Sequence, residues 1–140
     1  MNRRIAHAAL LGSLILALVL APLALARGGA GRGGGGGGST FSLVLMDGAT
    51  QAAHYGRITF DVSTTETAVP EVGLRCYQGS NWVYDAYVGY YPGYLFERWF
   101  RLQSNYWVDG VAATCNARLF YFDRRGREVV LRTMSFPVAP

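Results

Sequence analysis

The twelve residues Val111-Ala-Ala-Thr-Cys-Asn-Ala-Arg-Leu-Phe-Tyr-Phe122 decide the fold of this chain, because their side chains alternate in polarity. One face would carry the polar residues Thr114, Asn116 and Arg118. The other face would carry Val111, Ala113, Cys115, Ala117, Leu119 and Tyr121. Successive side chains of a strand point to opposite faces, so this alternation predicts a β-strand that is buried on one side.

Six further segments have strand character and are separated by turn sequences. They are residues 41–46, 57–63, 72–77, 82–91, 96–102 and 128–138. Turn signals between them include Asp47-Gly48, Pro92-Gly93 and Gly126. The region after residue 40 has no helical periodicity. Seven short strands joined by turns predict an all-β fold, an antiparallel sandwich of two sheets.

Residues 1–26 have the three-part layout of a secretory signal peptide. Arg3 and Arg4 form the basic start, a long apolar run follows, and Ala24-Leu-Ala26 fits a cleavage site. The alternative is an uncleaved membrane anchor, because the apolar run approaches the length of a transmembrane helix. We therefore expect a secreted or cell-surface protein, which would contact a membrane only through this segment if it is retained.

Residues 27–39 are mostly glycine and are predicted to be a flexible linker to a domain at 40–140. The linker contains Arg-Gly-Gly repeats of a kind that binds RNA, but export argues against an RNA partner. All 13 basic residues are arginine, and they face 9 acidic residues. Loss of Arg3 and Arg4 with the signal would leave a nearly neutral chain, so the charge predicts no nucleic-acid partner.

Cys76 and Cys115 are the only cysteines, and an exported chain with two cysteines favours a disulfide between them. Counting strands places Cys76 on the third and Cys115 on the sixth. If the count is right, the bond joins neighbouring strands of one sheet.

The stretch Asp109-Gly-Val-Ala-Ala-Thr-Cys115 resembles the sixth-strand signature of the immunoglobulin superfamily. Asp109, Val111 and Cys115 match it, whereas Ala113 stands where the family has a tyrosine. Trp82 also follows Cys76 too closely to be the family's core tryptophan. The resemblance implies a seven-stranded immunoglobulin-like sandwich, similar to small modules of bacterial secreted and surface proteins.

The sequence offers little for catalysis. After the signal segment the only histidine is His54, which we expect to be a solvated loop residue. Asp85 and Glu97 are expected to pair across strands with Arg98 or Arg101. No catalytic motif and no metal-ligand cluster is visible, so we expect neither an enzyme nor a cofactor.

Aromatic residues are dense between positions 77 and 107. Alternation would place Trp82 and Tyr84 on one face of their strand, Tyr87 and Tyr91 on the other, and Trp99 outward. Phe96, Phe100 and Leu102 would face inward. The residues expected to form an exposed binding surface are Tyr91, Tyr94, Trp99, Tyr106 and Trp107.

These observations lead to one expectation and two alternatives. We expect a non-catalytic module that binds a protein partner or a cell-surface polymer through exposed aromatics. The first alternative is a carbohydrate-binding accessory module that uses the same residues. The second is a structural component of the cell envelope, in which the aromatics only cover the ends of the sandwich.

Overall fold

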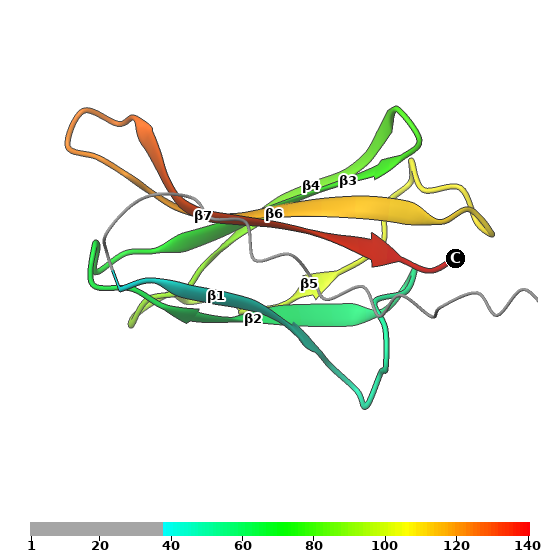
Figure 1. Cartoon of the computed structure of the whole chain (residues 1–140), viewed down its shortest axis with the longest axis horizontal. Coiled ribbons are helices and arrows are strands. Elements are labelled where there is room, and N and C mark those ends of the chain that lie inside the picture. The colour runs from blue at the N-terminus through cyan, green and yellow to red at the C-terminus, as the bar shows by residue number, and fades with distance from the viewer. Residues whose placement is uncertain (1–37) are drawn as a thin grey trace, which may run out of the picture.

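The computed structural model describes residues 38–140 and forms two antiparallel sheets that face each other (Figure 1). The predicted signal peptide, residues 1–26, lies outside the described residues, as does the linker up to residue 37. Within residues 38–140 there are seven strands and no helix, which confirms the all-β prediction.

Each sheet combines strands that are neighbours in the chain with strands from a distant part of it. The three-stranded sheet has the order β1-β2-β5, with β1 at Thr40–Leu45, β2 at Arg57–Ser63 and β5 at Phe100–Arg101. The four-stranded sheet has the order β4-β3-β6-β7. Its strands are β3 at Glu71–Gln78, β4 at Asn81–Gly89, β6 at Ala113–Phe122 and β7 at Glu128–Val138.

Strand β6 lies inside the four-stranded sheet, paired with β3 on one side and β7 on the other. The predicted alternation is confirmed for Ala113, Cys115, Ala117 and Leu119, which are all buried. Val111 is an exception: it precedes the strand and is 43% exposed, so its predicted inward position is wrong.

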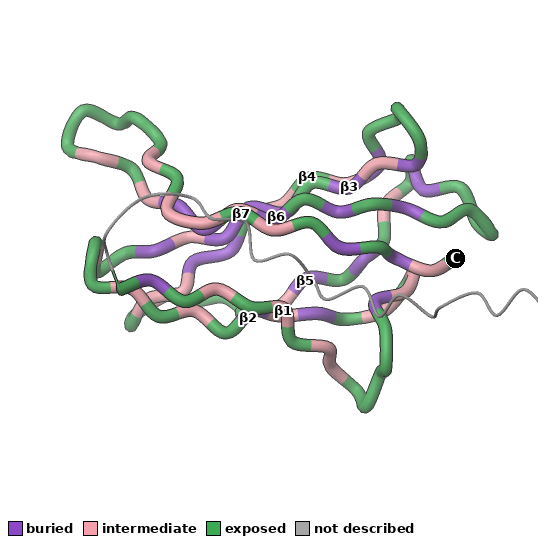
Figure 2. Tube along the Cα trace, viewed as in Figure 1, coloured by how far each residue is buried: buried purple, intermediate pink, exposed green. Residues whose placement is uncertain are grey.

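The core fills the space between the two sheets (Figure 2). Ile58 and Phe60 of β2 belong to the same buried cluster as Val72 and Leu74 of β3, and the rings of Phe60 and Phe100 meet edge to face at 5.8 Å. Removing these apolar side chains from water supplies the main driving force for packing the two layers together.

The disulfide prediction is confirmed. Cys76 of β3 and Cys115 of β6 lie directly opposite each other and are bonded, with their Cα atoms 4.0 Å apart. Both residues are fully buried. The bond therefore joins neighbouring strands of one sheet, as the strand count indicated, and does not link the two layers.

The predicted strand at 96–102 is mostly wrong, because only Phe100–Arg101 pairs with β2. Side-chain hydrogen bonds hold the preceding residues as a loop instead. The Tyr90 hydroxyl donates to the Arg98 carbonyl at 3.1 Å, and Arg98 donates to the Tyr91 carbonyl at 2.7 Å. Phe96 is consequently 75% exposed and does not face inward.

The predicted alternation of side chains along β4 is wrong at one point, because the pairing of β3 with β4 contains a β-bulge. Cys76 is opposite Tyr84 and the next residue, Tyr77, is opposite Trp82, so Val83 is an extra residue in the pairing. Val83 is buried, while Trp82 is exposed on the outer face of the sheet. Trp82 and Tyr84 therefore do not share a face, because the bulge shifts the alternation by one residue.

Candidate functional site

The five aromatic residues predicted as one surface are distributed over three places in the structure. Tyr106 is 70% exposed, as expected, but its neighbour Trp107 is only 7% exposed and belongs to the core. The predicted exposure of Trp107 is therefore wrong. Tyr91, Tyr94 and Trp99 are half-buried and lie in the 90–99 loop, not in the 103–112 loop.

Tyr91 and Tyr94 cover the end of strand β4. Their rings meet edge to face at 5.5 Å and lie against Gly89. A Cβ atom at position 89 would be 2.6 Å or less from both rings, so glycine is required for this contact. These two tyrosines pack on backbone and present only part of their surface to solvent.

Trp99 lies under an arginine. The Arg57 guanidinium is 5.5 Å from the centre of the Trp99 ring, a cation–π arrangement. Arg57 Nε also donates to Asp47 at 2.9 Å, and this hydrogen bond lowers the pKa of the Asp47 carboxyl. Trp99 is thus half-buried and covered in part by its partner.

The 103–112 loop is fixed by a buried glutamine. Gln78 Nε2 donates to the carbonyls of Val108 at 2.9 Å and Val111 at 2.8 Å, and its Oε1 accepts from the Val108 amide at 2.9 Å. The Ser104 hydroxyl also donates to the Val83 carbonyl. Backbone groups that lack strand partners are satisfied in this way, so the loop has a defined conformation.

His54 anchors the same loop from the other side, and its predicted solvation is wrong. Its side chain is only 5% exposed, its Nδ1 lies 3.2 Å from Asp109 Oδ1, and its ring stacks on both Tyr55 and Trp107. The Tyr55 hydroxyl donates to the same Asp109 oxygen at 3.2 Å, and the Asp109 charge raises the pKa of Tyr55. His54 therefore connects the loop before β2 to the loop before β6.

Beside the polar Gln103, Asn105 and Asp109, this fixed loop exposes three large apolar or aromatic side chains. We call them, together with the neighbouring Trp82, the end patch: Trp82, Tyr106, Val108 and Val111, all exposed. The Trp82 and Tyr106 rings are 6.0 Å apart and inclined by 25°. Sequence reasoning missed Trp82, because its outward position depends on the bulge in β3–β4 pairing.

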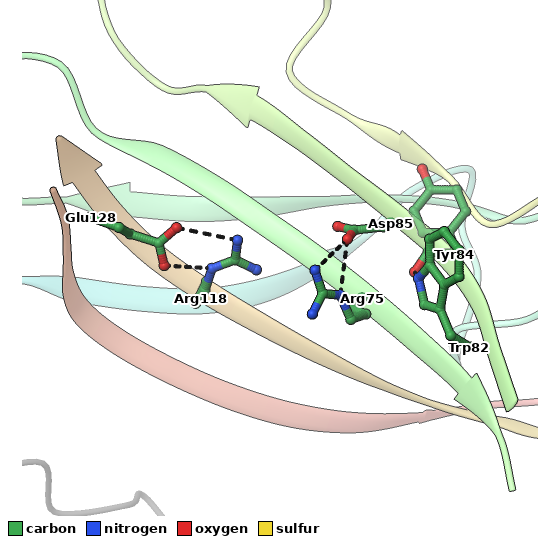
Figure 3. A network of polar contacts seen from close by, with 6 residues as sticks. All are labelled: Arg75, Trp82, Tyr84, Asp85, Arg118 and Glu128. Carbon is green, nitrogen blue, oxygen red and sulfur yellow. Dashed lines mark hydrogen bonds and ion pairs between the residues drawn. The ribbon is translucent and has the colours of Figure 1, made fainter. Parts of the chain in front are cut away.

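Polar side chains cover the outer face of the four-stranded sheet (Figure 3). Arg75 Nε donates to Asp85 at 2.9 Å and Arg118 Nε donates to Glu128 at 2.8 Å. The pKa of Arg75 is raised by its hydrogen bonds to Asp85 and then to Tyr77. Asp85 therefore pairs with Arg75 directly across the strands, not with Arg98 or Arg101, which lie in or next to the other sheet.

A shallow groove of about 640 Å³ crosses this face, and we call it the outer groove. Its lining comes from β3, β6 and β7 and consists of Arg75, Tyr77, Asn116, Ala117, Arg118, Thr133, Met134 and Ser135. The Ser135 hydroxyl donates to Asn116 Oδ1 within it. The sequence predicted that Asn116 and Arg118 point outward, but not that three strands place them beside Arg75 and Ser135.

Among residues 38–140, no three His, Cys, Asp or Glu side chains are grouped so that they could hold a metal ion. No helix in the same range is long and apolar enough to cross a membrane. Comparison of the sequence with protein-family models, curated proteins and solved structures found no significant match.

Proposed function

We propose that this chain is a secreted, non-catalytic immunoglobulin-like module that binds a protein partner through the end patch. The observation that carries the proposal is the contrast within the 103–112 loop. Gln78, His54 and the buried Trp107 hold its backbone, while Tyr106 and Val108 face solvent.

A fixed loop that exposes apolar side chains is well suited to association. Its conformational entropy has already been lost on folding, so binding does not have to order it. Aromatic side chains contribute disproportionately to the cores of protein interfaces. Val108 and Val111, two exposed valines of the same loop as Tyr106, favour an apolar protein surface over a cell-surface polymer rich in hydroxyl groups.

The strand order supports the immunoglobulin-like part of the proposal. Named along the chain, β1, β2 and β5 would be strands A, B and E, and β4-β3-β6-β7 would be C′-C-F-G. The disulfide departs from the antibody pattern, since it would join C to F within one sheet. The disulfide and the predicted signal peptide both support the extracytoplasmic location.

A retention assay tests the binding role. The purified domain would be applied to surface material from the producing cells, with and without prior protease treatment. Saturable, protease-sensitive retention is expected for the native protein, and at least about tenfold weaker retention for Tyr106→Ser/Val108→Ser. The matched control is Val69→Ser, an exposed valine of the β2–β3 loop, which should bind normally.

Three outcomes would overturn the proposal. Equal retention of the end-patch variant and the control would show that the patch is not the binding surface. No retention of the native protein by any fraction would favour the alternative of a structural envelope component. Retention that survives protease, is removed by glycosidases and is lost in Tyr106→Ser/Val108→Ser would favour a carbohydrate ligand at this patch.

A further inference from the structure

We infer that the outer groove is a second binding site, which holds an uncharged polysaccharide chain laid across strands β3, β6 and β7. The inference goes beyond the proposed function, because it uses a different face of the molecule and does not require the end patch to bind.

Strand register places the polar groups of the groove in rows. Arg75, Asn116 and Ser135 are opposite one another on three neighbouring strands, and Asp85 of β4 extends this row. The spacing of strands in a sheet gives the four-residue row a length of about 14 Å, which exceeds a single sugar ring. An extended chain therefore fits this row better than a monosaccharide.

The rows on either side form the walls of the groove. Tyr77 of β3 lines one side. On the other side, Arg118 and Thr133 are opposite each other on β6 and β7. A sugar ring has apolar C–H faces and polar edges, so it matches a surface in which one aromatic face stands beside fixed hydrogen-bonding groups.

The charges of the groove cancel locally. Arg75 is paired with Asp85 and Arg118 with Glu128, so each guanidinium already has its counter-charge (Figure 3). A strongly anionic polymer would gain little from such neutralised arginines, and a cationic polymer would find both carboxylates occupied. Neutral hydroxyl groups can still accept from the remaining guanidinium N–H groups and bond to the amide and hydroxyl groups of the row.

Arg118 is held in place as well as neutralised. Its guanidinium lies over the Phe120 ring at 5.1 Å and over the backbone of Gly73. A Cβ atom at position 73 would be 2.8 Å from Arg118 Nη1, so any larger residue would displace the guanidinium. Because the planar Arg118 guanidinium is already fixed, its N–H donors lose little conformational entropy when a ligand binds. Such a group is suited to hydrogen-bonding a pair of ligand hydroxyls.

Affinity electrophoresis with soluble polysaccharides tests the inference. The probes are hydroxyethyl cellulose, mixed-linkage β-glucan, galactomannan and dextran as uncharged chains, and polygalacturonate and heparin as anionic chains. The native protein should be retarded by at least one uncharged chain, and retardation should persist at about 0.5 M salt, where exposed charges are screened.

Groove variants locate the binding. Asn116→Ala/Ser135→Ala should weaken binding about tenfold or more, and Gly73→Ala should weaken it by displacing Arg118. Ser42→Ala is the matched control, because Ser42 is an exposed hydroxyl residue on β1, in the other sheet. It should bind like the native protein. Circular dichroism of each variant would verify that the fold is retained.

Three results would overturn the inference: no retardation by any uncharged chain, retardation by anionic chains alone that disappears in salt, or equal binding by the groove variants and the control. None of them bears on the end patch. Conversely, a Tyr106→Ser/Val108→Ser protein that loses its protein partner should still bind polysaccharide, so the two proposals fail separately.

Discussion

The ring of His54 lies parallel to that of Trp107, with the ring centres 4.8 Å apart and the planes inclined by 8°. This contact joins the loop before β2 to the 103–112 loop and places Trp107 in the core. The neighbouring residues Tyr106 and Trp107 therefore have different roles. The Tyr106 side chain faces solvent, whereas the Trp107 side chain packs in the core and fixes the backbone of the loop.

Substitution at these two positions should therefore affect stability very differently. Trp107→Ala removes a large buried side chain and its stacking contacts, and should lower the free energy of unfolding by about 3–5 kcal/mol. Tyr106→Ala removes an exposed side chain and should change it by less than about 0.5 kcal/mol. Chemical denaturation of both variants measures the difference, and equal losses would contradict the assignment of roles.

Gln78 should control the order of the 103–112 loop. Gln78→Ala removes three hydrogen bonds to this loop, each worth about 1 kcal/mol, and leaves their backbone partners unpaired. We expect a stability loss of about 2–4 kcal/mol and faster hydrogen exchange of the Val108 amide. Hydrogen exchange followed by NMR measures this directly. An unchanged Val108 rate would show that the loop is held by other contacts.

The disulfide should contribute to stability without determining the topology. Cys76→Ala/Cys115→Ala should lower the free energy of unfolding by about 2–4 kcal/mol, since the cross-link restricts the unfolded chain. The β3–β6 pairing should persist, because Leu74 and Ala117 continue the buried contact. Intact mass after alkylation without reduction should show no modified cysteine. Two modified cysteines would contradict the bonded pair.

Stability should also depend on pH through Glu71. Burial, and then the nearby Glu128 charge, raise the pKa of the Glu71 carboxyl, and its Oε2 has no hydrogen-bond partner among the described residues. A raised carboxyl pKa means that the folded state binds the proton more tightly than the unfolded state. The stabilisation is thus fully present below the unfolded pKa and is lost as pH rises through the folded pKa.

Glu71→Gln should therefore raise Tm at pH 7 relative to the native protein, and the advantage should vanish below roughly pH 4. Thermal unfolding of both proteins across this range tests the sign. Glu66→Gln, at an exposed loop position, controls for the change in net charge. A Tm difference that is the same at every pH, or one that grows towards acid, would contradict the role of Glu71.

Much of the fold was predictable because it depends on alternation. Six of the seven strands and the two sheets follow from apolar periodicity, and the Cys76–Cys115 bond follows from the presence of only two cysteines in a chain expected to be exported. The pattern failed where one residue is inserted or where side chains replace the strand ladder. Val83 in the bulge and the 90–99 loop held by Tyr90 and Arg98 are the two examples.

The site was less predictable because its contacts join residues far apart in the sequence. The sequence around His54 contains no signal that Asp109 and Trp107 are its partners, so the burial of the histidine side chain was not predicted. Adjacent aromatics such as Tyr106 and Trp107 look equivalent in a sequence. Only the packing of the loop against Gln78 and His54 decides which of them faces solvent.

Photocross-linking from the end patch tests the central claim most directly. A benzophenone side chain in place of Tyr106 should, on irradiation with surface material from the producing cells, form one discrete protein adduct. The same group in place of Val69, at the far end of the sandwich, should form none. Equal labelling from both positions, or no adduct from position 106, would contradict the assignment of the end patch as the binding surface.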